Sequence, residues 1–180
     1  PLFNHLRLIC ALREGPYGAV AVNGQIERLL VRRRPVRGGI PWYVGRPVMV
    51  LRNDYSLRLF NGDVGIVLPE PIMNNELRVF FPGEGIAFRS FPISRLPEHE
   101  TVFAMTVHKS QGSEFDDVHL ILPDRDVPLL SRELIYTAIT RARQSIHIWG
   151  FEEVFLQAVV RRTERVSGLH DALWTENVTR

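Results

Sequence analysis

The chain has 180 residues, of which 45% are hydrophobic and 23% are charged. This length suits one ordinary domain or two small ones, and the apolar content is that of a globular protein. No apolar run approaches the roughly 18 residues that a membrane-spanning helix needs, so we expect no contact with a membrane. The formal net charge of +2 permits contact with nucleic acid but does not require it.

The single cysteine, Cys10, excludes an internal disulfide and a zinc site built from several cysteines. Its apolar surroundings predict a buried thiol, and the low cysteine content predicts a cytoplasmic protein. The chain begins with Pro1 rather than methionine, which we interpret as a sign that it is part of a longer protein.

The first part of the chain predicts one strand and one helix. An apolar run over 6–12 is typical of a buried strand, and the Pro/Gly-containing segment 13–18 predicts a loop. Apolar residues at helical spacing predict a helix over 21–33. Glycines and prolines then predict an irregular connector over 32–47.

The pattern changes to short β-rich runs between 46 and 96. Asn61-Gly62-Asp63 is typical of a type I′ hairpin, in which both central residues have positive φ. Strands so short and so closely spaced predict a small barrel or sandwich of roughly 50 residues. The expected strands cover 47–53, 63–68, 77–81 and 85–91.

Strands and helices alternate again after Pro97. This order predicts an α/β layer with a mainly parallel sheet, to which the first strand and helix also belong. We therefore expect one α/β domain that carries a β module inserted into it. The expected strands cover 101–106, 117–123 and 144–150, and the expected helices cover 131–143 and 152–165.

The expected helix over 131–143 has an apolar face and one noteworthy arginine. Ser131 is a plausible N-cap, and Glu133 suits the positive end of the helix. Arg141 follows Thr137 by one turn and is predicted to project from the margin of the apolar face, where it could reach into a cleft. The alternative is an ordinary surface arginine. The apolar face comprises Leu134, Ile135, Ala138, Ile139 and Ala142.

A polar stretch follows the strand that ends at Thr106, and it contains Lys109, the only lysine of the chain. Ligands of open α/β sheets collect at the carboxyl ends of the strands. Gly112 lets the backbone approach a ligand closely, and Glu114 can accept hydrogen bonds from ribose hydroxyls. The alternative is a solvated loop with a helix cap.

Two familiar sites are missing from the sequence. The only lysine follows a histidine, so the chain has no Walker A motif, and no acidic pair follows a strand as in Walker B. Asp116 and Asp117 are expected to precede their strand. No pair among His99, His108, His119, His147 and His170 has the helical spacing of metal ligands, so we expect no metal site.

Four segments resemble those of a known family. The sequence AMTVHKSQGSEFDDVHLIL resembles motif V of superfamily 1 DNA helicases, and RELIYTAITRARQSIHI resembles their motif VI. ICALREGPYGAVAVNGQIE is similar to the motif IV region of the RecD branch. The segment around WYVGRPVMVLRNDYSLRLFNGDVGIVL and the tail RRTERVSGLHDAL resemble the RecD subunits of the bacterial RecBCD exonuclease.

The resemblance implies a fold and a domain division. It implies an α/β, RecA-like second motor domain, 2A, with a parallel sheet and flanking helices, formed by 1–34 and 98–180. A small SH3-like β-barrel, domain 2B, would be inserted over 35–97.

The resemblance also implies roles at an ATP site shared with a first motor domain. Arg141 matches the motif VI arginine that reaches the γ-phosphate, and Arg13 matches a second arginine, from motif IV. Gly112 and Glu114 match the positions near the nucleotide sugar. The implied cofactor is ATP with Mg²⁺, bound jointly with the N-terminal motor domain that holds Walker A and Walker B, so we expect the chain alone to be inactive.

A second group of residues is implied to face single-stranded DNA. The function implied is the C-terminal motor half of an ATP-dependent 5′-to-3′ DNA helicase subunit, with RecB and RecC as partner subunits. The alternatives are a DNA- or partner-binding module without a motor role, and a free RecD-type or relaxase-type helicase. The residues implied at DNA are Thr106, His108, Lys109 and Ser110.

Overall fold

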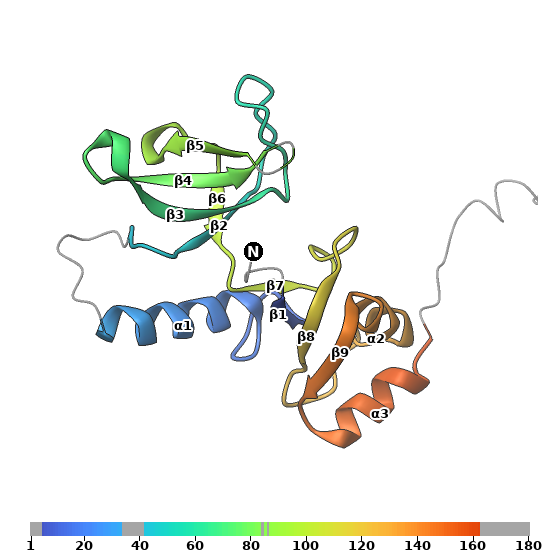
Figure 1. Cartoon of the computed structure of the whole chain (residues 1–180). Helices are drawn as coiled ribbons and strands as arrows, with labels where there is room; N and C mark the ends of the chain where they lie inside the picture. Colours follow the sequence, from blue (N-terminus) through green and yellow to red (C-terminus); the bar gives the residue numbers. More distant parts are fainter. Residues whose placement is uncertain (1–4, 34–41, 84, 86, 163–180) are drawn as a thin grey trace, which may run out of the picture.

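The structure, a computed structural model, describes residues 5–33, 42–83, 85 and 87–162. It contains two separate sheets (Figure 1). One has four strands in the order β7-β1-β8-β9, and the other has five strands in the order β5-β4-β3-β2-β6. No described helix is both long and apolar enough to cross a membrane.

The four-stranded sheet is parallel throughout, as the alternation of strands and helices predicted. Strand β1 is central and pairs with β7 on one side and with β8 on the other, and β9 extends the sheet beyond β8. The expected α/β fold with a parallel sheet is therefore confirmed. The strands are β1 (Leu6–Cys10), β7 (Ala104–Thr106), β8 (Phe115–Ile121) and β9 (Ala142–Trp149).

Three helices flank this sheet. Helices α2 (Arg132–Ile139) and α3 (Glu152–Val160) pack into the larger apolar core, which includes Ile9, Val118 and Leu120 of the strands. Helix α1 (Ala19–Arg33) packs against β1 and β7 around Cys10 and Ala104. The expected apolar stripe of α1 is only partly buried, because Leu29 is 62% exposed.

Helix α2 is shorter than predicted, and this changes the position of Arg141. Ser131 caps the helix as expected, since its hydroxyl accepts from the backbone N–H of Leu134 at 3.3 Å. The helix ends at Ile139, however, and Ala142 already pairs with Phe115 as the start of β9. Arg141 therefore lies in the turn between α2 and β9, because sheet pairing outweighs the helical pattern of the sequence.

The other expected boundaries also shift. Strand β8 includes Asp116 and Asp117, which were predicted to precede it. Helix α3 ends at Val160, and the last residues of the helix expected over 152–165 lie outside the described part.

The second sheet is antiparallel and encloses its own core, centred on Val67, Val79 and Phe81. The strand expected over 101–106 is in fact two strands, one in each sheet, so the chain crosses between the sheets at 102–103. Assignment of this module as an SH3-like barrel remains a prediction. Its strands are β2 (Pro47–Val50), β3 (Val64–Glu70), β4 (Glu76–Pro82), β5 (Phe88–Pro92) and β6 (His99–Thr101).

The predicted type I′ hairpin at Asn61-Gly62-Asp63 is wrong. Gly62 has φ of +96°, but Asn61 is not among the described residues with positive φ. The N–H of Asp63 bonds to the carbonyl of Phe60 at 2.9 Å, so the turn has one left-handed residue instead of two. It closes the longer loop 51–63 between β2 and β3.

A buried asparagine joins α1 to the edge of the parallel sheet. The Nδ2 of Asn23 donates to the carbonyl of Ala104 at 2.8 Å, and the N–H of Ala104 donates to Oδ1 of Asn23 at 2.9 Å. The side chain amide thus satisfies both backbone groups of one residue of β7. Such a buried pair is costly to break, because both partners would stay unsatisfied.

We expect Asn23→Ala to lower the free energy of unfolding by about 1–3 kcal/mol, because the two backbone groups of Ala104 would lose their partner. Urea unfolding followed by circular dichroism measures this loss. The exposed neighbour Gln25 provides the control, since Gln25→Ala should change stability by less than about 0.5 kcal/mol. Equal losses in both variants would contradict the proposed link.

Burial also predicts a pH dependence at Cys10. The thiol is fully buried, and burial raises its pKa from 9.0 to about 12. Between these values the unfolded chain releases a proton that the folded chain keeps, so stability is complete below pH 9 and falls as the pH rises further.

We therefore expect the free energy of unfolding to fall between pH 8 and 10 by about 1 kcal/mol more in the wild type than in Cys10→Ala. Urea titrations of both proteins at the two pH values measure the difference. Parallel pH profiles would mean that the Cys10 thiol ionises in the folded state as readily as in the unfolded chain.

Candidate nucleotide and DNA site

The polar loop 107–114 carries most of the predicted site residues, and it connects β7 to β8. These strands are parallel and lie on either side of β1, so the loop must pass from the carboxyl end of β7 to the amino end of β8. Val107 and Ser110 are buried along this path. The two ends of the loop therefore lie at opposite ends of the sheet. The sequence had predicted a single site at the carboxyl ends of the strands.

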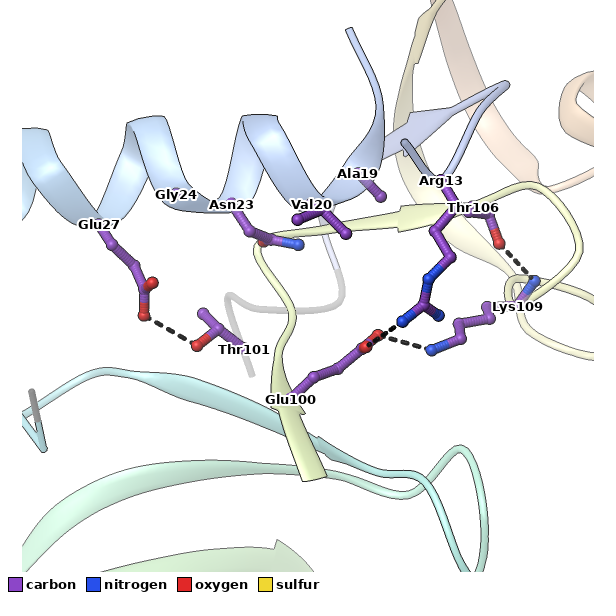
Figure 2. A pocket seen from close by; sticks show the side chains of 10 residues that line it. All are labelled: Arg13, Ala19, Val20, Asn23, Gly24, Glu27, Glu100, Thr101, Thr106 and Lys109. Atoms are coloured by element: carbon purple, nitrogen blue, oxygen red, sulfur yellow. Dashed lines mark hydrogen bonds and ion pairs between the residues drawn. The ribbon is translucent and has the colours of Figure 1, made fainter. Parts of the chain in front are cut away.

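Lys109 lies at a pocket of about 370 Å³ between α1, the loop and strand β6 (Figure 2). Its Nζ donates to Oε1 of Glu100 at 2.6 Å. The guanidinium of Arg13 lies 3.9 Å from the other oxygen of Glu100 and 3.4 Å from Glu14. We call Arg13, Thr106, Lys109 and Glu100 the Lys109 cluster.

The same pocket has a second carboxylate on its other side. Oε1 of Glu27 accepts from the hydroxyl of Thr101 at 2.8 Å and lies 3.6 Å from Nε of Arg46. Tyr43 also reaches this carboxylate, and burial together with Glu27 raises the pKa of its phenol. The charge of Glu27 is thus compensated by its own partners.

The remaining residues predicted at DNA differ in accessibility. His108 is exposed, and Thr106 is half-buried with its hydroxyl accepting from the N–H of Lys109 at 3.3 Å. Ser110 is fully buried, and its hydroxyl donates to the carbonyl of Val107 at 2.7 Å. This side chain does not reach the surface in the structure, and the role of Ser110 at DNA stays a prediction.

Arg141 connects the far end of the loop to α2. Its guanidinium donates to the carbonyl of Ser113 at 3.1 Å, to the carbonyl of Thr137 at 3.2 Å and to the hydroxyl of Thr140 at 3.1 Å. The N–H of Phe115 also bonds to the carbonyl of Arg141 at 2.8 Å. The two helicase-like segments, far apart in the sequence, therefore meet at this residue.

Glu114 stands between Ser113 and Phe115, which both bond to Arg141, and its side chain pairs with a different arginine. Its Oε2 accepts from Nε of Arg143 at 3.1 Å, with both side chains more than half exposed. We call Ser113, Glu114, Arg141 and Arg143 the Arg141 cluster. Glu114 and Ser113 also line a second pocket of about 360 Å³, and Lys109 is among its other lining residues.

The structure thus divides the predicted residues between two clusters. No contact in the described part of the chain joins Arg13 to Arg141, although both were predicted at the γ-phosphate. Arg13 instead shares Glu100 with Lys109. Its predicted role at ATP stays a prediction.

Sequence reasoning missed Glu100 and Arg7. Glu100 is part of a short polar strand that gives no signal of its own. Arg7 is 3% exposed inside an apolar strand, where it donates to the carbonyl of Val102 at 3.2 Å and its guanidinium lies 4.8 Å from the centre of the Phe115 ring. Burial lowers its pKa to about 10. An arginine within the run LRLIC was the available signal.

Comparison with known proteins finds helicase relatives for the segments that resemble motifs V and VI. The UvrD-like helicase C-terminal domain family matches residues 101–148. The RecD subunit of the RecBCD enzyme from Mycobacterium tuberculosis is 42% identical over 91% of this chain. The RecD subunit from Haemophilus influenzae is 36% identical over 93% of the chain, and the ATP-dependent RecD2 DNA helicase from Deinococcus radiodurans is 32% identical over 88%.

The chain spans only 28%, 25% and 22% of the lengths of these three relatives. The fold is similar to Pif1 helicase from Bacteroides in complex with ADP-AlF3 and ssDNA, with a TM-score of 0.57 and 17% identity, over 94% of this chain and 44% of that one. Pif1 helicase from Candida albicans gives a TM-score of 0.56 with 14% identity, over 94% and 50%. The sequence matches to RecD subunits confirm the resemblance, whereas the Pif1 structures show similarity of the fold alone.

Position 112, between the two clusters, favours glycine because of its backbone conformation and not because a side chain would clash. Its φ is +82°, and an added Cβ would meet no atom within 4 Å. We expect Gly112→Ala to lower the free energy of unfolding by about 1–2 kcal/mol, because L-residues are strained in this region. Chemical unfolding in urea measures the effect.

Gly24 provides the opposite control, since it lies inside helix α1 with nothing within 4 Å of an added Cβ. Gly24→Ala should raise stability by about 0.5–1 kcal/mol. A neutral Gly112→Ala would mean that the loop adopts another conformation.

Proposed function

We propose, starting from its relationship to RecD subunits, that this chain is the second motor domain of an ATP-dependent 5′-to-3′ DNA helicase subunit. Residues 1–34 and 98–180 would form the motor domain, and 35–97 an inserted SH3-like barrel. The first motor domain, with Walker A and Walker B, would belong to the rest of a longer protein. The match to only about a quarter of each relative's length supports this division.

The observation that carries the proposal is the position of Arg141. A guanidinium has five N–H groups, and the three described bonds leave two of them for a ligand. The three acceptors hold the planar group in one orientation before any ligand binds. Such a fixed cation is suited to neutralise charge that develops during phosphoryl transfer.

The residues beside Arg141 suit the rest of a nucleotide. Glu114 would accept hydrogen bonds from a ribose hydroxyl, after exchange of its exposed pair with Arg143. Gly112 would let the backbone approach the sugar. Bound ATP with Mg²⁺ supplies the phosphoanhydride that is hydrolysed, while Arg141 would hold a phosphate oxygen at the domain boundary. Arg13 remains a second proposed contact of the γ-phosphate.

Single-stranded DNA is the proposed substrate of the other cluster. The cation of Lys109, the exposed His108 and the hydroxyl of Thr106 are groups that bind phosphate oxygens. The loop 107–114 joins these residues to the carbonyl of Ser113, which Arg141 binds. A shift of the loop on nucleotide hydrolysis would therefore move the DNA contacts. RecB and RecC are the proposed partner subunits.

The proposal predicts the effect of Arg141→Ala in the longer protein. Loss of the guanidinium should lower the kcat of DNA-stimulated ATP hydrolysis by at least about 10³-fold, as for other arginine fingers. Single-strand affinity should change little. Phosphate release at saturating ATP and DNA measures the effect, and thermal unfolding checks that the variant folds.

Arg125→Ala is the matched control, because Arg125 is exposed on the same domain and has no described partner. Unchanged ATP turnover in Arg141→Ala would contradict the motor role and favour a binding module. ATP turnover by the 180-residue chain alone would contradict the assignment of the phosphate site to another domain.

A further inference from the structure

Both cations of the Lys109 cluster face one carboxylate. Figure 2 shows the side chains of Arg13 and Lys109 converging on Glu100 across the pocket. Nζ of Lys109 lies 2.6 Å from Oε1, and the Arg13 guanidinium lies 3.9 Å from Oε2. Glu100 is therefore the anionic partner of Lys109 and a more distant neighbour of Arg13, which also pairs with Glu14 at 3.4 Å. Cations of this kind also hold phosphate groups.

The two sides of this contact come from different sheets. Arg13 follows β1 and Lys109 follows β7, which are adjacent parallel strands. Glu100 belongs to β6, which pairs with β2 in the antiparallel sheet. The cations therefore follow strands of the parallel sheet, and the carboxylate reaches them from the antiparallel sheet.

Glu100 and Lys109 are partly exposed, so an incoming anion can reach the pair. The Lys109 and Glu100 side chains are 28% and 29% exposed, and that of Arg13 is 57% exposed. Ion pairs at such partly exposed positions contribute little to stability. The other carboxylate of the pocket, Glu27, is bound to Thr101 and Arg46 and does not compete for Lys109.

We propose that Glu100 occupies the position of a DNA phosphate at Lys109, and that single-stranded DNA must displace it to bind. This inference rests on the proposed function, because it takes Lys109 as a DNA contact. Glu100 is then an internal competitor that lowers DNA affinity. Its displacement releases one contact between the sheets, while the Thr101–Glu27 bond remains.

The test is the affinity of Glu100→Gln for a short labelled oligothymidylate, measured by fluorescence anisotropy on this chain at fixed salt. Removing the competing charge should tighten binding by about two- to fivefold, the range that a partly exposed ion pair provides. Glu98→Gln is the matched control. This change removes the same charge from an exposed side chain two residues away, so the affinity for the oligonucleotide should stay unchanged.

Lys109→Gln should weaken binding, and the gain from Glu100→Gln should disappear in the double variant. Equal gains in Glu98→Gln and Glu100→Gln would overturn the inference, because the effect would then be one of net charge. If Glu100→Gln does not fold, Glu100→Asp replaces it, since the shorter side chain reaches Lys109 less well and should give a smaller gain.

The outcomes separate this inference from the proposed function. Weaker binding by Lys109→Gln together with no gain from Glu100→Gln overturns the inference and leaves the DNA site intact. Absence of oligothymidylate binding in the wild type and in Glu100→Gln overturns both.

Discussion

The buried hydroxyl of Ser110 fixes the loop on which the whole site depends. The loop 107–114 crosses from β7 to β8 without a helix, so its backbone groups must find partners on the way. The Ser110 hydroxyl donates to the carbonyl of Val107, and the backbone N–H of Ser110 donates to the carbonyl of Thr106. This compact turn directs Lys109 to one end of the sheet, and Gly112 then lets the chain continue to Ser113 and Arg141. The buried serine thus shapes the backbone that presents its neighbours.

The two sheets are joined by polar contacts around one pocket. Glu100 and Thr101 of β6 reach Lys109 and Glu27 of the other unit, and Arg46 adds a further contact to Glu27. Each apolar core lies mainly within its own sheet, apart from a few residues such as Met49 that belong to the larger core. Polar contacts can be exchanged for contacts with a charged ligand at low cost, whereas an apolar interface would have to be exposed to water. The polar contacts of this boundary can therefore be exchanged more easily than the apolar contacts of residues such as Met49.

The class of fold was predictable because it depends on local patterns. The alternation of strand-like and helix-like segments predicted the parallel strands, and Ser131 marked the start of α2 correctly. The end of α2 was not predictable, because the helical spacing of apolar residues continues to Ala142. In the structure Ala142 pairs with Phe115 and therefore belongs to strand β9. The site followed the same rule. Lys109 and Arg141 were identified from their segments, but Glu100 reaches Lys109 only through the folding of a second sheet, and no local pattern reports such a contact.

The amide of Asn23 also has a consequence for contacts between molecules. Strand β7 is an edge of the parallel sheet, and an edge strand offers unpaired N–H and C=O groups to any passing extended chain. Asn23 occupies both backbone groups of Ala104, the first residue of this three-residue strand. A neighbouring polypeptide therefore cannot begin a ladder at Ala104. The helix that carries Asn23 thus protects the sheet against self-association as well as stabilising it.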